Sequence, residues 1–461
     1  MKRYIILFLV TIALDACESF VEIAPPKTES VSSIVYADDV SATAAIRGIY
    51  HEMVRSGFAS GLSSSVTFVG GASADELISY GSALDEFYNN NVLPTSNSNS
   101  AIWAGAYKSI YYCNSAIEGL QQSTSITAAV RNQLLGEAKF IRSFCHFYLT
   151  NLYGEIPIST STDYVVNSSS KRATKDQVIA LIKQDLTEAQ GLLANDFQFT
   201  SSERVRVTSW AASAMLARVH LYSGDWVNAE SVSTTVINQA TLFKLVTDLN
   251  VAFLKNSTEA IWQLMPVVTG QNTNEGSLFI PFSSTSLPST ASLTTSLINS
   301  FEVGDKRKTN WTGNQTVAAT VIYFPLKYKV RLLNQPVTEY SMVLRLAEQY
   351  LIRSEARARQ GKLPESMSDL DVIRSRAGLP SIQTKIPVPT MDNLLLAIEQ
   401  ERRVEFFSEW GHRWLDLKRW DRANAVLQPV KPGWALTDLL YPIPQTELAA
   451  NPNLNPQNSG Y

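Results

Sequence analysis

The feature that most constrains the fold is an apolar stripe with the period of an α-helix. Between residues 134 and 152, apolar side chains recur at steps of three and four, and a glycine and a proline follow shortly afterwards. Residues at this spacing share one helix face, and glycine and proline end a helix. The sequence therefore predicts a mainly α-helical protein. Comparable stripes cover residues 101–120, 210–221 and 344–358.

Two of these segments predict helical hairpins of the tetratricopeptide type. Ala217 and Ala229 occupy positions where two antiparallel helices touch closely, and Gly224 allows the tight turn between them. A second copy covers residues 350–373, with serines at two positions where alanine is usual. The segments before and after residue 125 could form a third hairpin. We expect these hairpins to form a scaffold, although their irregular spacing rules out a simple tandem array.

The region from about 256 to 337 has a different character. Ser, Thr, Asn, Gly and Pro dominate it, and the helical period fades. Ala260–Leu264 and Val321–Phe324 are typical of short strands. The pattern predicts a loop-rich, irregular lobe that carries a few short strands and rests on the helical scaffold. Loops on a rigid scaffold are where binding residues concentrate.

Charge excludes one class of partner. Charged residues make up only 18% of the 461 residues, and the net charge is −3. A protein that binds nucleic acid through bulk charge would carry an excess of lysine and arginine. The hydrophobic fraction of 45% also excludes wholesale disorder, which needs low hydrophobicity and high net charge. We expect a globular protein with no nucleic-acid partner.

The start of the chain is typical of a secretory signal. Two basic residues precede an apolar run at 4–14, which is too short to span a bilayer. The run ends in Leu-Asp-Ala-Cys, which resembles a bacterial lipobox with Cys17 as the lipid attachment site. We expect residues 1–16 to be a lipoprotein signal peptide, 17–33 a lipidated tether, and 34–461 a single α-helical domain. An ordinary signal with a chance cysteine is the alternative.

The residues themselves contain no recognisable catalytic constellation. The four histidines lack the spacing of a helical metal site, and there is no nucleophile elbow or phosphate loop. Cys113 and Cys145 lie in helical patterns and are expected to be buried, although a disulfide between them stays open. The acid pairs Asp38–Asp39 and Asp75–Glu76 could serve a glycosidase, but adjacent acids usually face solvent or cap helices. We therefore expect no catalytic residues, no metal and no cofactor.

A cluster of charges near residue 400 allows two interpretations. Its members recur at spacings of three and four residues, so they lie on adjoining helical turns. They could form a catalytic site or an ion-pair network that joins the last helices, and the network is favoured. The members are Glu401, Arg402, Glu405, Glu409, Arg413 and Asp416.

Several segments together resemble one family. They follow an apparent lipobox in a fixed order along the chain, which makes the combination more specific than any single motif. The chain resembles the SusD/RagB-like outer-membrane lipoproteins of the Bacteroidota. The matching segments are Trp103–Asn114, Glu137–Pro157, Glu401–Phe407, Trp410–Trp420 and Tyr441–Tyr461.

This resemblance implies a role in nutrient capture. Members of the family sit on the cell surface, held to the outer membrane by a lipid anchor, and pair with a SusC-like TonB-dependent transporter. They bind a glycan, most often an oligosaccharide, or in some relatives a peptide, and pass it on without covalent chemistry. The peptide ligand and a tetratricopeptide scaffold that binds other proteins remain alternatives.

The resemblance also implies a ligand site among loops. Sugar rings stack on Tyr and Trp, and their hydroxyl groups meet Asn, Asp and Arg side chains. The loop before Trp103 is the first candidate and the irregular lobe the second. The expected ligand contacts are Asp75, Tyr80, Tyr88, Asn97, Trp311 and Tyr323.

Overall fold

The computed structural model describes residues 32–461 except Ser60 and Gly81. The expected signal peptide, the lipidated Cys17 and most of the expected tether therefore lie outside the described residues. The last two tether residues open helix α2 (Ser32–Val35), so helical structure begins slightly earlier than expected. Within the described part, no helix is both long and apolar enough to cross a membrane.

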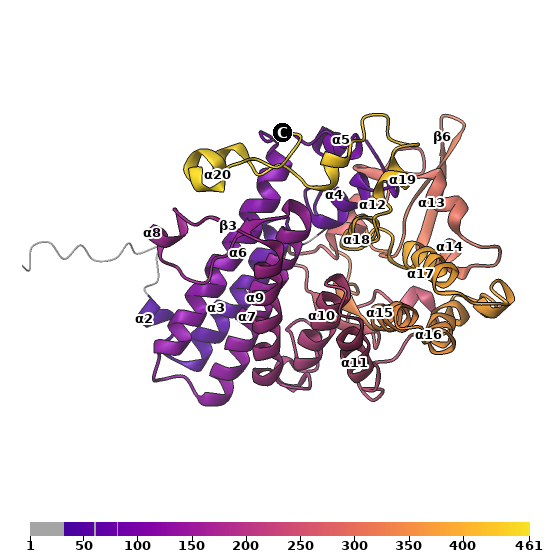
Figure 1. Ribbon diagram of the computed structural model, residues 1–461. Coiled ribbons are helices and arrows are strands. Elements are labelled where there is room, and N and C mark those ends of the chain that lie inside the picture. The colour runs from indigo at the N-terminus through magenta and orange to yellow at the C-terminus, as the bar shows by residue number, and fades with distance from the viewer. Residues whose placement is uncertain (1–31, 60, 81) are drawn as a thin grey trace, which may run out of the picture.

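A row of antiparallel helices forms the scaffold (Figure 1). Each helix contacts the next, from α6 and α7 through α9, α10 and α11 to α15, α16 and α17. The contact between α11 and α15 joins segments that the whole irregular lobe separates in sequence. The bounds are α3 Asp39–Arg55, α6 Asn97–Gln122, α7 Ala128–Tyr153, α9 Lys175–Leu192, α10 Ser209–Tyr222, α11 Trp226–Ile237, α15 Leu346–Arg359, α16 Leu363–Arg376 and α17 Met391–Phe406.

The expected hairpins are present. Gly224 turns the chain between α10 and α11 with a φ of 72°, and Gly361 does the same between α15 and α16 with a φ of 76°. In the second hairpin, Ser354 and Ser366 each donate a hydroxyl hydrogen bond to the other's backbone carbonyl, at 2.8 and 2.7 Å. These reciprocal bonds let two polar side chains fill positions where alanine is usual.

Several shorter helices lie along the upper edge of the view in Figure 1, above this row. Helix α4 packs against α18 and α5, which brings residues near 70 against residues near 411. The bounds are α4 Val66–Ser73, α5 Ser82–Tyr88, α8 Tyr164–Asn167, α12 Asn274–Phe279, α13 Thr295–Ser300, α14 Lys306–Trp311, α18 His412–Arg419, α19 Ala423–Leu427 and α20 Gln445–Ala450, with single 3₁₀ turns at Gln198–Thr200, Leu249–Val251, Ile382–Thr384, Leu436–Leu439 and Pro452–Leu454.

The strands of the described chain form four two-stranded antiparallel sheets. Both segments expected to be strands are strands, β4 and β7. Helix α15 starts later than its apolar stripe suggests, because Leu344 belongs to β8 and pairs with Trp262 of β4. The pairs are β1 Leu77–Ser79 with β5 Ala291–Leu293, β2 Ile156–Pro157 with β3 Arg172–Ala173, β4 Ala260–Leu264 with β8 Ser341–Arg345, and β6 Thr312–Val317 with β7 Thr320–Pro325.

An aromatic cluster joins the helical row to the rest of the molecule. Trp262 of β4 meets Phe140 and Phe144 of α7 edge to face, with ring centroids 5.2 and 5.3 Å apart. Trp410, from the turn between α17 and α18, meets Phe144 at 5.2 Å and donates its indole N–H to the carbonyl of Met342 at 2.7 Å. The core is therefore continuous from α7 through β4 and β8 to the last helices.

Candidate functional site: a polar aromatic pocket at the end of α5

A pocket with a volume of about 660 Å³ lies where α5 ends. Three segments that are distant in sequence form its walls. Figure 1 shows α5, α19 and the C-terminal end of the described chain along the same edge of the molecule. The side chains that line the pocket include Tyr88, Asn89, Asn90, Asn91, Lys431, Asp438 and Tyr461.

An asparagine turn builds the first wall. Asn90 has a φ of 51°, a left-handed conformation that asparagine tolerates better than most residues, and this turn ends α5. The Asn90 side-chain amide donates to the carbonyl of Ser73 at 3.3 Å, and the Asn91 backbone N–H donates to the carbonyl of Glu86 at 2.8 Å. These bonds fix the turn against α4 and hold Tyr88 at the pocket.

Lys431 forms part of the second wall. Its ammonium nitrogen donates to the carbonyls of Ala72 and Ser73 at 2.5 and 3.1 Å, and lies 5.3 Å from the centroid of the Tyr88 ring. Burial of the ammonium group lowers the pKa of Lys431 to about 7. The negative charge of Asp75 raises this pKa, but by less than burial lowers it. The lysine is therefore only partly charged near neutral pH.

Asp438 and Tyr461 complete the pocket. Asp438 Oδ2 accepts the backbone N–H of Ala435 at 2.7 Å, while burial raises the pKa of its carboxyl above the usual range. The Tyr461 hydroxyl donates to the carbonyl of Leu440 at 3.1 Å, and burial raises its pKa as well. The pocket thus combines two phenol rings with a carboxyl, a lysine and several amides. Such a set can stack on the C–H face of a sugar and exchange hydrogen bonds with its hydroxyls.

Of the six expected ligand contacts, Tyr88 lines this pocket. Tyr80 and Tyr323 lie in the strand region. The Tyr80 hydroxyl lies 2.8 Å from the Ser292 hydroxyl, and β7, which carries Tyr323, contacts β5. Both tyrosines are half-buried. Asn97 is exposed at the first turn of α6. The strand contacts thus bring the regions of Tyr80 and Tyr323 together, but neither residue lines the pocket.

Trp311 requires a correction. The sequence suggested a loop aromatic, but the residue ends α14 and is fully buried. Its indole N–H donates to the carbonyl of Leu249 at 2.9 Å, and its ring meets Phe253 edge to face at 5.5 Å. The ammonium group of Lys327 lies 4.9 Å from the ring centroid. Trp311 is a core residue and presents no ring face to a ligand.

Asp75 is also committed to the interior. Arg413 donates to its Oδ1 at 2.8 Å, and Arg403 donates to its Oδ2 at 2.6 Å. Burial alone would raise the pKa of Asp75, but the two guanidinium groups outweigh burial and hold it below the usual range. We therefore remove Asp75 from the expected sugar contacts.

Sequence reasoning missed Lys431, Asp438 and Tyr461. The Pro432-Gly433 turn that follows the lysine does mark a loop, which could have drawn attention to this segment. Nothing in the local pattern, however, indicates that this loop meets the turn after α5.

The charge cluster near residue 400 is an ion-pair network, as favoured. Glu405 is completely buried, and its carboxylate accepts hydrogen bonds from Arg345 at 2.5 Å, from Arg307 at 2.9 Å and from Arg376. Burial alone would raise the pKa of Glu405, but these three guanidinium groups hold it well below its usual range. The other five members are also buried and ion-paired, namely Glu401, Arg402, Glu409, Arg413 and Asp416.

The remaining polar candidates have structural roles. His146 is buried, and its Nδ1 lies 2.9 Å from the carbonyl of Arg142, one helical turn earlier. His220 Nδ1 lies 2.8 Å from Asp225 Oδ2. Cys113 and Cys145 are free and buried. No group of three or more His, Cys, Asp or Glu side chains suited to a metal occurs among the described residues.

Two family models match the chain. The model described as "Starch-binding associating with outer membrane" matches residues 36–221, and the SusD family model matches residues 308–461. Most of the irregular lobe lies between the two matched segments and is covered by neither of them.

Relatives that match most of the chain agree with these matches. A SusD-like protein of Bacteroides ovatus is 24% identical over 91% of this chain and 83% of its own length. SusD-like protein P25 of Formosa agariphila is 23% identical over 78% of this chain and 80% of its own length.

Solved structures share the fold. A SusD superfamily protein from Bacteroides vulgatus has a TM-score of 0.81 at 21% identity, covering 92% of this chain and 100% of that chain. A laminarin-binding SusD-like protein has a TM-score of 0.78 at 24% identity, covering 92% of this chain and 99% of that chain. The helical hairpins, the order of the matched segments and these relatives lead to one assignment: the chain belongs to the SusD/RagB-like family.

Proposed function

We propose that this protein captures oligosaccharides at the cell surface and delivers them to a SusC-like TonB-dependent transporter. The observation that carries the proposal is the pocket at the end of α5, where Tyr88 and Tyr461 accompany Asp438, Lys431 and an asparagine turn. Its volume of about 660 Å³ accommodates several sugar rings. A relative of the same fold is a laminarin-binding protein, which supports a glycan as the ligand.

The protein acts by binding and release rather than by catalysis. The acids of the cluster near residue 400 are paired with arginines, so this cluster does not supply the free acid and base that glycoside hydrolysis needs. A peptide ligand and a protein-binding scaffold are the other candidates. The mixture of phenol rings and hydrogen-bonding groups in the pocket favours the glycan.

Replacing Tyr88 with alanine should weaken glycan binding about tenfold, because the pocket loses a ring that supplies roughly 1–2 kcal/mol of stacking. Isothermal titration calorimetry of the full chain, in detergent, with laminarin-type and other oligosaccharides measures this. A peptide panel and product analysis accompany it. Tyr164→Ala is the matched control, since that ring is 77% exposed and lies outside the pocket.

Tyr80→Ala and Tyr323→Ala separate the pocket from the strand region. A loss of affinity in these two variants, with Tyr88→Ala unaffected, would move the ligand site to the strand region. Binding to peptides alone would replace the glycan by the peptide, and cleavage of any ligand would contradict a pure binding role.

We place the protein on the outer membrane through a lipid on Cys17. Replacing Cys17 with serine should abolish lipidation and release the protein from the membrane fraction, because stable anchoring requires the acyl chains. Mass spectrometry of the N-terminal peptide and membrane fractionation measure this.

Purification of the wild-type protein from its own membranes should retain a TonB-dependent transporter. Recovery of the protein without a transporter would contradict the proposed partner.

A further inference from the structure

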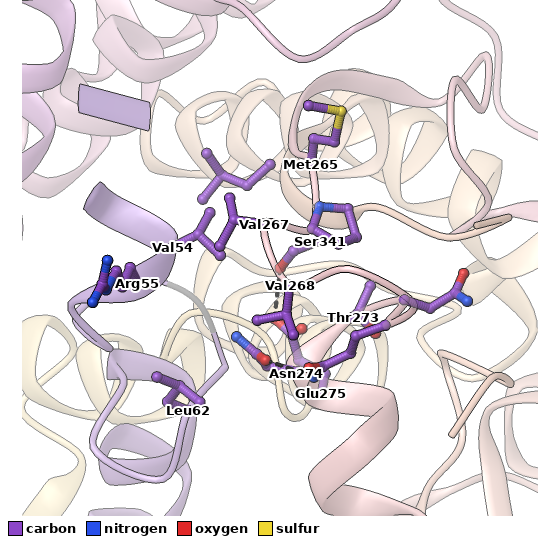
Figure 2. A pocket seen from close by; sticks show the side chains of 14 residues that line it. Val54, Arg55, Leu62, Met265, Val267, Val268, Thr273, Asn274, Glu275 and Ser341 are labelled. Atoms are coloured by element: carbon purple, nitrogen blue, oxygen red, sulfur yellow. Dashed lines mark hydrogen bonds between the residues drawn. The ribbon is translucent and has the colours of Figure 1, made fainter. Parts of the chain in front are cut away.

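A second pocket, of about 120 Å³, lies on a different part of the molecule and shares no lining residue with the pocket at α5. Its walls come from the C-terminal end of α3, the segment after β4 and the first turn of α12. Figure 2 shows side chains from these segments surrounding it, with Glu275 and Ser341 joined by a dashed hydrogen bond.

Glu275 is the unusual group in this pocket. Its side chain is buried, with 4% of the residue exposed, and Oε1 accepts the Ser341 hydroxyl at 2.6 Å. The second oxygen, Oε2, has no hydrogen-bond partner among the described residues. Gly61 packs so closely on this carboxyl group that a Cβ there would lie 2.3 Å from Glu275 Cδ. A buried carboxyl oxygen without a partner is costly unless a bound molecule satisfies it.

The surroundings of Glu275 are acidic. Burial raises its pKa, and the carboxyl groups of Glu339 and Glu409 raise it further. Their own partners lie elsewhere: Glu339 accepts the backbone N–H groups of residues 329 and 330, and Glu409 pairs with Arg345 and Lys327. The unpartnered Oε2 at the base of the pocket can therefore accept a hydrogen bond from a positively charged donor.

The walls above this carboxyl are aliphatic. Val54 and Leu264 are buried beside the pocket, and Val267 and Val268 complete this side. Such walls suit a methylene chain, since each buried CH₂ contributes about 0.8 kcal/mol. Arg55 is exposed and lies at the edge of the pocket (Figure 2), where its charge opposes a second cation on the same ligand.

The pocket opens toward a larger cleft. A neighbouring cleft of about 650 Å³ shares four lining residues with it, including Val54 and Met265. The cleft has Tyr50, Glu203 and Arg206 among its lining residues, so its surface mixes polar and apolar groups. A side chain in the small pocket would therefore leave room for the body of its molecule in the cleft.

We infer that the small pocket binds a primary ammonium group on a short aliphatic chain, of the kind that a lysine side chain of a peptide presents. The ammonium would donate to Glu275 Oε2, its methylene groups would lie against the valines and Leu264, and the peptide would occupy the cleft. A metal ion fits less well, because the described residues offer no group of three acidic, histidine or cysteine ligands here. This site goes beyond the glycan capture proposed above and does not depend on it.

Calorimetry of the full chain tests the inference with four probes: n-pentylamine, n-pentanol, Nα-acetyl-lysine methylamide and cadaverine. The amine should bind at least tenfold more tightly than the alcohol of similar size, and the lysine derivative should bind more tightly than cadaverine. Glu275→Gln should weaken amine binding at least tenfold while the melting temperature stays the same or rises. The Tyr88→Ala variant should bind the amines as the wild type does.

A second variant covers the case in which Glu275→Gln does not fold. Val268→Trp fills the pocket from a wall residue that is 54% exposed, so folding should tolerate it while amine binding disappears. Val303→Trp, at a fully exposed position, is the matched control and should bind as the wild type does. Equal binding of amine and alcohol, or no binding of any amine, would overturn the inference. Tighter binding of cadaverine than of the lysine derivative would contradict a lysine side chain as the ligand and would indicate a free diamine instead.

Discussion

Replacing Arg345 with methionine is expected to lower the free energy of unfolding by about 3–5 kcal/mol, because it leaves buried carboxylates without a counter-charge. The guanidinium of Arg345 donates to Glu259 at 3.0 Å, to Glu405 at 2.5 Å and to Glu409 at 2.9 Å. Methionine preserves much of the side-chain volume but none of the hydrogen bonds. The midpoint of urea unfolding, followed by tryptophan fluorescence, measures the loss.

The matched control for Arg345 is Arg47→Met on α3, where the arginine is exposed. That substitution should change the free energy of unfolding by less than about 0.5 kcal/mol. If Arg345→Met were as stable as this control, the network would contribute little to the fold.

The second large effect is expected for Trp311→Ala, which should cost about 3–5 kcal/mol. The indole is completely buried, so alanine leaves a cavity beside Phe253. The carbonyl of Leu249 also loses its hydrogen-bond donor. Because the ring faces the core, glycan affinity per folded molecule should stay within about twofold of the wild type. Thermal unfolding and calorimetry on the same sample separate the two quantities.

Phe282→Ala is the control for this variant, since Phe282 lies in the same lobe but is 77% exposed. Its effect on unfolding should be small. A Trp311→Ala protein that keeps its stability but loses glycan binding would restore Trp311 as a ligand contact.

Periodicity predicted the helical scaffold well because each helix carries its own signal. The stripe from residue 134 to 152 lies within α7, and Gly154 caps that helix with a φ of 77°. Leu344 shows where periodicity fails as a predictor. It fits the apolar stripe of α15, but its pairing with β4 holds it in strand β8. A tertiary contact of this kind leaves no mark on the local pattern.

The candidate site was less predictable for the same reason. Tyr88 was among the expected ligand contacts, although it ends helix α5 rather than lying in a loop. Its neighbours Lys431 and Asp438 come from the far end of the chain. Trp311 misled because polar residues surround it in sequence, whereas its burial is decided by Phe253 and Lys327 from other segments. Loop residues reach a binding site through the fold rather than through their spacing.

The ion-pair network also imposes an order on folding. Its partners are spread from Glu259 through Arg345 to Glu409, so no short part of the chain contains a complete set. Contacts between such distant residues form late, since a long loop must close before they contribute. Until the final helices emerge from the ribosome, Arg345 therefore lacks two of its partners, Glu405 and Glu409. The stabilisation that the network provides is thus available only to the finished chain.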